Sequence, residues 1–175
     1  MKYILGLLVA IIVLVGAFFW LNNYIYDEKQ GGAEDYKNAT YVIGNEPITL
    51  VNGRSERAAA PGSAEKIVTQ YFGNNAKGDL NADSVPDLAF ILTQSGGGSG
   101  TFYYAVVALQ NPAGRYNGTN AVLLGDRIAP QSTEIRDGKL IANYADRSLG
   151  EPMSAQSSLG VSMYLHVVNG ELLEE

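Results

Sequence analysis

Four oxygen-bearing side chains stand close together in the segment GDLNADSVPDLAF (residues 78–90), directly before an apolar run. They are Asp79, Asn81, Asp83 and Asp87, at spacings of two, two and four residues. Calcium takes about six to eight oxygen ligands from carboxylates, amides and backbone carbonyls on a tightly curled loop. We therefore predict that these four side chains, with the backbone carbonyl of Val85, bind calcium and that the ion stabilises the domain.

The spacing D-x-N-x-D-x-x-x-D before a strand resembles the calcium loops of FG-GAP repeats and of dockerin-like segments. It is not an EF-hand, since the twelfth position is Phe90 instead of a bidentate glutamate. Loops of the resembling kind usually carry glycine at the fourth and sixth positions, where this chain has Ala82 and Ser84. The alternative is an acidic turn that caps the strand through Asx-turn hydrogen bonds of Asn81 and Asp83.

Further acidic residues follow later in the chain, as the dipeptides Asp126-Arg127 and Asp146-Arg147 and as Glu151. Three such carboxylates could serve acid–base chemistry on a glycan, so a hydrolase of envelope polymers is the alternative function. Adjacent residues of a strand point to opposite faces, so we expect ion pairs between the two dipeptides and none within them. A salt-bridge network is the favoured interpretation, and we predict no catalytic residue.

Composition removes several classes of protein. The chain has 175 residues, a net charge of −6, no cysteine and one histidine, His166. A disulfide framework, a zinc–thiolate site, a catalytic thiol and a multi-histidine metal centre are therefore excluded. The arginines are dispersed among carboxylates, so we predict no binding to nucleic acid. His166 lies among apolar neighbours and is expected to be a half-buried strand residue.

The N-terminal segment indicates a membrane anchor. Residues 3–21 contain no charged side chain and would span roughly 28 Å as a helix, close to the thickness of a bilayer. Lys2 precedes this segment and acidic residues follow it, which places the N-terminus in the cytoplasm and the remainder outside. The alternative is a secreted protein, cut after Ala17 by signal peptidase. We favour a single-pass protein of the cytoplasmic membrane, with the lipid bilayer as partner of residues 3–21.

The domain organisation follows from these boundaries. Residues 1–26 form the anchor, the polar stretch 27–39 with its Gly-Gly pair is a linker, and residues 40–175 form an extracytoplasmic β-rich domain. Three dipeptides in this domain suit type I′ turns, which need φ > 0 at both central positions. They predict hairpins at Asn52-Gly53 (strands 47–51 and 54–58), at Asp137-Gly138 (132–136 and 139–145) and at Asn169-Gly170 (161–168 and 171–174).

Two runs, residues 87–94 and 101–110, are apolar at both even and odd positions, which is typical of central strands covered on both faces. The segment SGGGSG (95–100) joins them; a flexible connection is favoured over a phosphate loop, because a strand follows it instead of a lysine and a helix. A further short strand is expected at 119–125. Residues 62–72 suit either a short helix with Ser63 as N-cap or a strand over 66–72. The predicted fold is mostly β, a single antiparallel sheet or sandwich-like domain with tight hairpins, behind an N-terminal transmembrane helix.

Residues 40–175 as a whole resemble a family of bacterial envelope domains to which no activity is assigned. The resemblance rests on the segments PGSAEKIVTQYFGN, GDLNADSVPDLAF, GGGSGTFYYAVVAL, NAVLLGDRIAPQ and YADR followed by EPM. Some members stand beside a META-type domain, which this chain lacks. The resemblance implies a place in the cell envelope. We therefore predict a membrane-anchored extracytoplasmic binding or structural module stabilised by calcium.

Overall fold

The computed structural model describes residues 15, 16, 18, 33 and 35–175. The chain divides into two units, Met1–Gly32 and Ala33–Glu175, and the second contains every strand described below. Nearly all of the predicted anchor, residues 3–21, lies outside the described residues. Within the described part, no helix has the length and apolar character needed to cross a membrane.

The second unit is built from strands, and its paired strands run antiparallel, as predicted. A single 3₁₀ turn, η1 (Tyr36–Asn38), precedes them in the described part. The strands are β1 (Thr40–Ile43), β2 (Glu46–Thr49), β3 (Arg54–Ala58), β4 (Lys66–Gly78), β5 (Asp87–Ser95), β6 (Phe102–Gln110), β7 (Tyr116–Gly118), β8 (Val122–Asp126), β9 (Ala129–Arg136), β10 (Lys139–Asp146), β11 (Leu159–Val168) and β12 (Glu171–Glu174).

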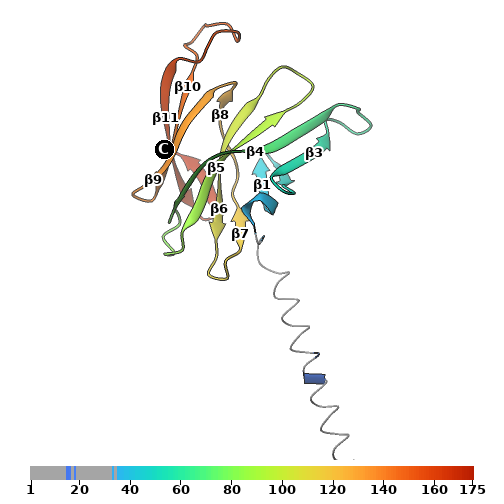
Figure 1. The fold of residues 1–175 in the computed structure, drawn as a ribbon, viewed down its shortest axis with the longest axis vertical. Coiled ribbons are helices and arrows are strands. Elements are labelled where there is room, and N and C mark those ends of the chain that lie inside the picture. The colour runs from blue at the N-terminus through green and yellow to red at the C-terminus, as the bar shows by residue number, and fades with distance from the viewer. Residues whose placement is uncertain (1–14, 17, 19–32, 34) are drawn as a thin grey trace, which may run out of the picture. The chain divides into compact units, whose positions relative to one another are not determined.

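The described strands form three sheets, so of the two predicted forms, a single sheet or a sandwich-like domain, the single sheet was wrong. The central sheet has the order β3-β4-β5-β6-β7, and β8 also pairs with β6. A second sheet has the order β12-β11-β10-β9, and β1 with β2 forms the third. In Figure 1 the β9–β11 strands lie on one side of β5 and β6, and β1 lies on the other.

The central sheet is covered on both faces, which confirms the prediction for β5 and β6. In β5, Ala89 and Ile91 belong to one buried cluster, together with residues of β10 and β11. Phe90 and Leu92 alternate with them and belong to another cluster, with Tyr41 of β1 and residues of β2. Side chains of a strand alternate between faces, so a strand between two layers must be apolar at every position.

Two of the three predicted hairpins are confirmed. Asp137-Gly138 joins β9 to β10, and Asn169-Gly170 joins β11 to β12. All four turn residues have positive φ, between 52° and 83°, as a type I′ turn requires.

The hairpin predicted at Asn52-Gly53 was wrong in its strand pairing. Both residues have positive φ, but the turn closes only an isolated bridge between Val51 and Arg54. β2 pairs with β1, which places Ile48 in the second cluster, while β3 pairs with β4 of the central sheet. The turn reversed the chain as expected, but burial of apolar side chains determined which strands paired.

The helix considered over residues 62–72 does not form, and the strand alternative is confirmed. β4 spans Lys66–Gly78, and it bonds β3 on one edge and β5 on the other. Its alternate side chains Thr69 and Tyr71 point toward the second cluster, where Thr69 is buried and Tyr71 packs. The β-branched and aromatic residues of this segment suit a half-buried strand better than a helix.

The segment before β1 also belongs to the compact unit. Asp35 caps η1, where its Oδ1 accepts a hydrogen bond from the Lys37 amide at 2.9 Å. Tyr36 packs against the second cluster, and its carbonyl accepts a hydrogen bond from the Tyr41 hydroxyl at 2.8 Å. Ala33 and residues 35–39, which were predicted to belong to the linker, therefore contribute to the fold.

Candidate functional site

The predicted calcium loop joins β4 to β5, with Asp79 just after the first strand and Asp87 at the start of the second. One oxygen of Asp79, Oδ2, accepts a hydrogen bond from the Ser84 amide at 2.9 Å. The other, Oδ1, is buried and has no hydrogen-bond partner among the described residues. Burying a carboxylate oxygen without a hydrogen-bond donor costs free energy. Asp79 Oδ1 is therefore the atom of the loop that a ligand would stabilise.

The middle of the loop forms the Asx-turn bonds of the alternative interpretation. Asn81 Oδ1 accepts from the Asp83 amide at 3.1 Å, and Asp83 Oδ1 accepts from the Val85 amide at 2.7 Å. The Asn81 side-chain amide also donates to Asp83 Oδ2 at 3.0 Å. The structure thus brings Asn81 and Asp83 into contact, and it orients both side chains by bonds to the loop's own backbone.

The two positions that carry glycine in the resembling loops have positive φ in this chain. Ala82 has φ of 61° and Ser84 has φ of 68°. The left-handed region costs a non-glycine residue about 1–2 kcal/mol. The loop therefore adopts a curled backbone although neither position is glycine. The hydrogen bond from the Ser84 amide to Asp79 stabilises one of these two strained positions.

Asp87 has a structural role that the sequence did not reveal. It is 0% exposed, its Oδ2 accepts from the Leu80 amide and its Oδ1 from the Gln110 amide, each at 2.9 Å. Burial raises the pKa of Asp87; the two amides offset part of that rise, and the charges of Asp83 and Asp79 add to it. Asp87 thus ties the loop to the end of β6, and both of its oxygens are already engaged.

The loop therefore fits a cation only in part. Within the part of the chain that the structure describes, no group of three or more acidic, histidine or cysteine side chains is arranged to hold a metal ion. Asp79, Asn81 and Asp83 lie on one loop, in which Asp79 Oδ1 has no hydrogen-bond partner among the described residues. Asp87, at the start of β5, adds negative charge near this loop.

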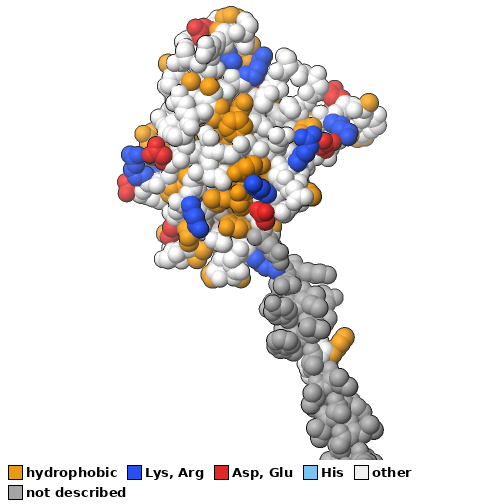
Figure 2. All heavy atoms as spheres, in the orientation of Figure 1, with side chains coloured by type: hydrophobic (Ala, Val, Ile, Leu, Met, Phe, Trp, Pro, Cys, Tyr) orange, Lys and Arg blue, Asp and Glu red, His pale blue; other side chains and the backbone are white. Residues whose placement is uncertain are grey.

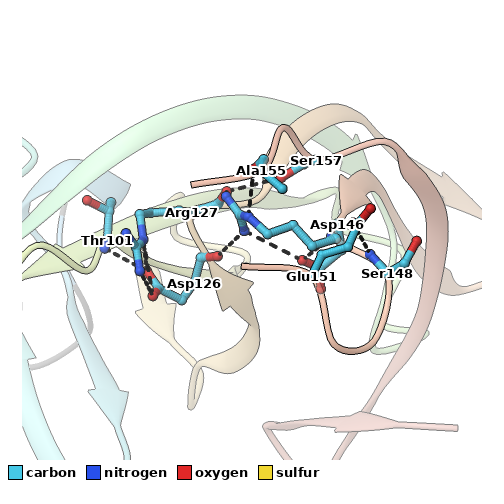
Figure 3. A network of polar contacts seen from close by, with 9 residues as sticks. Thr101, Asp126, Arg127, Asp146, Ser148, Glu151, Ala155 and Ser157 are labelled. Atoms are coloured by element: carbon cyan, nitrogen blue, oxygen red, sulfur yellow. Dashed lines mark hydrogen bonds and ion pairs between the residues drawn. The ribbon is translucent and has the colours of Figure 1, made fainter. Parts of the chain in front are cut away.

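The acidic residues of the alternative hydrolase lie in a network organised by Arg147 (Figure 3). The Arg147 guanidinium donates to the carbonyls of Asp126 at 3.2 Å, Arg127 at 2.9 Å and Ala155 at 2.9 Å. Its side chain is only 10% exposed. Ser157 Oγ also donates to the Arg127 carbonyl at 3.2 Å, so the β8–β9 turn and the loop after β10 are joined through backbone oxygens.

The expectation of ion pairs between the two dipeptides was wrong. Asp126 pairs with its neighbour Arg127, with 3.1 Å between Oδ2 and Nη2. Arg127 lies beyond the end of β8 and has φ of 50°, so the alternation of strand side chains does not apply to it. Asp146 likewise lies nearest its own neighbour, at 4.0 Å from Arg147 Nη1.

The three carboxylates of this region accept hydrogen bonds from backbone amides. Asp146 Oδ1 accepts from the Arg147 amide at 2.7 Å, and Glu151 Oε2 accepts from the Ser148 amide at 2.8 Å. Asp126 Oδ1 accepts from the Thr101 amide at 2.8 Å. Burial alone would raise the pKa of Asp126, but hydrogen bonds from Arg127 and Thr101 outweigh it and lower the pKa below its ordinary value.

A cavity of about 460 Å³ lies beside this network, lined by Asp126, Arg127, Phe102, Glu65 and the glycine-rich segment 95–98 among others. Asp146 and Glu151 do not line it. The segment SGGGSG was predicted as a flexible connection, and the structure shows that it also forms one wall of this cavity. The cavity was not predictable from the sequence because its walls come from distant stretches of chain, within residues 59–67, 94–102 and 126–127.

His166 lies on β11 and is partly buried, as predicted, with its Nδ1 atom buried and unpartnered among the described residues. In Figure 2, basic and acidic side chains lie side by side over β3 and near the β9–β10 turn. Comparison with known proteins adds no relative to this description: no family model matches the chain, and neither curated proteins nor solved structures gave a match. What the geometry defines by itself is the class, an antiparallel β domain of three sheets with an acidic loop and a lateral cavity.

Proposed function

We propose that the protein is a membrane-anchored extracytoplasmic binding or structural module whose β domain is stabilised by calcium. The observation that carries the calcium part is Asp79 Oδ1, a buried carboxylate oxygen without a donor in the loop after β4. No side chain of the described residues neutralises this loop, since the ion pairs of the domain lie elsewhere. A cation would supply both the missing partner and the missing charge.

The charges of the loop support the same proposal. Burial is the main cause of the raised pKa of Asp87, and the negative charges of Asp83 and Asp79 add to it. The side chains of Asp79, Asn81 and Asp83 and the Val85 carbonyl would hold the ion, while Asp87 would act through its charge. All of these are hard oxygen ligands, which favours calcium over zinc or copper, and magnesium demands a stricter octahedron.

The cellular location is part of the proposal and rests on the sequence. Residues 3–21 would anchor the chain in the bacterial cytoplasmic membrane with the β domain outside, and the resemblance to envelope domains supports this place. The alternative is secretion after cleavage at Ala17.

Cysteine labelling tests the location, because the chain has no cysteine of its own. In intact cells, a membrane-impermeant maleimide should label Ser154→Cys, an exposed position in the loop after β10, and should leave Lys2→Cys unlabelled until the cells are permeabilised. Labelling of Lys2→Cys but not of Ser154→Cys in intact cells would show that the chain has the opposite orientation. Loss of that cysteine from the mature chain, with a lower mass, would show the cleaved form.

Thermal melts test the calcium part, with the full chain in a sugar-free detergent and either calcium or a calcium-selective chelator. Calcium at a hundredfold excess over Kd should stabilise the folded state by about 2.7 kcal/mol and raise Tm accordingly. Asp79→Asn keeps the shape of the side chain but removes its charge, so the rise should disappear. Glu171→Gln removes one exposed charge on β12 and should keep the full rise.

Equal melting temperatures in calcium and in chelator would reduce the loop to an acidic turn. A rise that survives Asp79→Asn would place the ion elsewhere. The hydrolase alternative gains no support from Asp146 and Glu151, because each carboxylate accepts a hydrogen bond from a loop amide and neither lines the cavity.

A further inference from the structure

The cavity beside β6 contains a row of three side chains from three strands. Gln94 of β5 stands directly opposite Phe102 of β6, and Phe102 stands opposite Asp126 of β8. Directly opposite residues of antiparallel strands share a face of the sheet, so an amide, an aromatic ring and a carboxylate lie side by side. All three line the same cavity of about 460 Å³, a size within the range of about 300–1,000 Å³ that is usual for ligand pockets.

Phe102 is the apolar platform of this row. The residue is 40% exposed, although Tyr104, two positions along the same strand, packs against the second cluster. Phe102 therefore shares the face that β1 and β2 cover elsewhere, at a position where this cover has ended. An aromatic ring left open inside a cavity, with polar groups on both sides, is suited to pack against the apolar face of a ligand.

The polar groups of the cavity both donate and accept hydrogen bonds. Gln94 donates through Nε2 to Thr69 at 3.0 Å, which fixes its amide and leaves Oε1 as an acceptor toward a ligand. Arg127 uses Nε and Nη2 on Asp126, which leaves Nη1 as a donor. Glu65 uses Oε1 for the Gly97 amide at 2.7 Å, which leaves Oε2 as a second acceptor.

The charges of the cavity favour a neutral ligand over an anion. Glu65 and Asp126 carry two negative charges and Arg127 carries one positive charge, so the lining is negative by one. The guanidinium of Arg127 is already paired with Asp126 at 3.1 Å and cannot serve as a free anion site. A lining with both donors and acceptors matches hydroxyl groups, which donate and accept, better than an ammonium group, which only donates.

From this geometry we propose that the cavity is a binding site for a neutral saccharide. A sugar ring would pack its C–H face on Phe102, and its hydroxyls would bond Gln94, Glu65 and Arg127. The site deepens the proposed function, since it names the ligand class of a binding module, but it does not depend on calcium.

Two glycines keep the cavity in its present shape. A Cβ at Gly97 would lie 2.5 Å from the Glu65 carboxylate, so a larger residue there would push the Glu65 side chain out of its present position. A Cβ at Gly100 would lie 3.3 Å from the Phe102 ring and 3.4 Å from Asp126 Oδ1. A larger side chain at Gly100 would therefore occupy the space next to the platform, which provides a second way to block the site.

The test is calorimetric titration of the full chain in a sugar-free detergent with cellobiose, maltose and chitobiose. At least one should bind with a Kd in the millimolar range or tighter, and Phe102→Ala should weaken that binding about tenfold or more. Gly100→Val should also weaken it. Phe72→Ala, which removes another exposed phenylalanine of the central sheet, at 45% exposure and outside the cavity, should leave it unchanged.

Three outcomes would overturn the proposal: no binding of the three disaccharides, equal binding by Phe102→Ala, and tighter binding of glucosamine than of glucose, which would indicate a cation site. Melting temperatures of the variants in chelator show that loss of binding is not loss of folding. Release of monosaccharides during the titration would support a saccharide ligand, but it would show that the protein is a hydrolase and not a binding module. Saccharide binding that persists in Asp79→Asn would separate this site from the calcium loop.

Discussion

The acidic loop between β4 and β5 and the network around Arg147 both contain carboxylates that accept backbone amides, but they differ in one unmade hydrogen bond. In the network, the carboxylates of Asp126, Asp146 and Glu151 each accept a backbone amide, and Arg147 lies among them with its guanidinium on three carbonyls. In the loop, one oxygen of Asp79 is left buried and without a partner among the described residues. Closely spaced acidic residues thus indicate a ligand only where the fold leaves a buried carboxylate oxygen without a hydrogen-bond donor.

The two regions also differ in what stabilises them. The network is held from inside the domain by a cation of the chain itself, whereas the loop has negative side chains and no basic residue between Lys77 and Asp87. We therefore expect substitution of Arg147 to act directly on folding, and substitutions of the loop carboxylates to change, in addition, how stability responds to pH and to added calcium.

The largest effect is expected from Arg147→Lys. A lysine ammonium cannot span the three carbonyls that the planar guanidinium reaches, and it leaves partly buried carbonyls without donors. The free energy of unfolding should fall by about 2–4 kcal/mol, measured by urea denaturation with circular dichroism. Arg136→Lys is the matched control: the Arg136 side chain is 66% exposed and forms an ion pair with Glu134, so a change below about 0.5 kcal/mol is expected there. Equal losses in both variants would show that Arg147 does not organise the network.

A second prediction concerns Asp87, which connects the loop to β6. In Asp87→Asn one carboxylate oxygen becomes an NH₂ group that faces a backbone amide, so a buried donor loses its acceptor. The free energy of unfolding should fall by about 1–3 kcal/mol at neutral pH. The measurement is again urea denaturation, with Glu171→Gln as the control for loss of one negative charge.

The contribution of Asp87 to stability can also be recognised by its dependence on pH. Because its pKa is raised in the folded state, that state binds a proton more tightly than the unfolded chain, whose aspartates titrate near about 3.9. The contribution of Asp87 is thus fully present below that value and is lost as pH rises through the folded pKa. This part of the pH profile should vanish in Asp87→Asn and shrink in calcium. An unchanged profile in the variant would assign it to other groups.

Much of the fold was predictable because local patterns decided it. The central place of β5 and β6 followed from apolar residues at every position, and two hairpins followed from Asp137-Gly138 and Asn169-Gly170. The pairing of β2 was not predictable in this way. A type I′ turn reverses the chain, but the partner of β2 was determined by the packing of Ile48 with Tyr41 in the second cluster.

The candidate site was predictable only as far as its bonds are local. The hydrogen bonds between Asn81 and Asp83 span two residues, and the spacing indicated them as an Asx turn; the bond from the Ser84 amide to Asp79 spans five residues. Asp87 instead meets Gln110, and Arg147 meets the carbonyls near Asp126, about twenty residues away in each case. Contacts at that separation depend on which strands are neighbours, which a pattern of residue types does not specify.

A smaller effect, of the opposite sign, is expected from Ser84→Gly. Ser84 has φ of 68°, and glycine adopts this region without the steric cost of a Cβ. The free energy of unfolding should rise by about 0.5–1 kcal/mol in chelator, after the greater flexibility of glycine in the unfolded chain is counted. Ser154→Gly, at an exposed position without positive φ, should instead be neutral or slightly destabilising. A loss of stability in Ser84→Gly would show that the serine makes a compensating contact.

The smallest effect is expected from Asp126→Asn, which removes the charge of Asp126 but keeps an oxygen for the Thr101 amide. The pair with Arg127 is partly exposed, so its loss should cost less than about 0.5 kcal/mol at neutral pH. The pKa of Asp126 is lowered in the folded state, so its contribution is present above about pH 3.9 and is lost as pH falls through the folded pKa. The difference between wild type and variant should therefore shrink in acid, opposite to the behaviour of Asp87. Denaturation curves of both variants over the same pH series measure this contrast, and parallel profiles would mean that loop and network carboxylates do not differ.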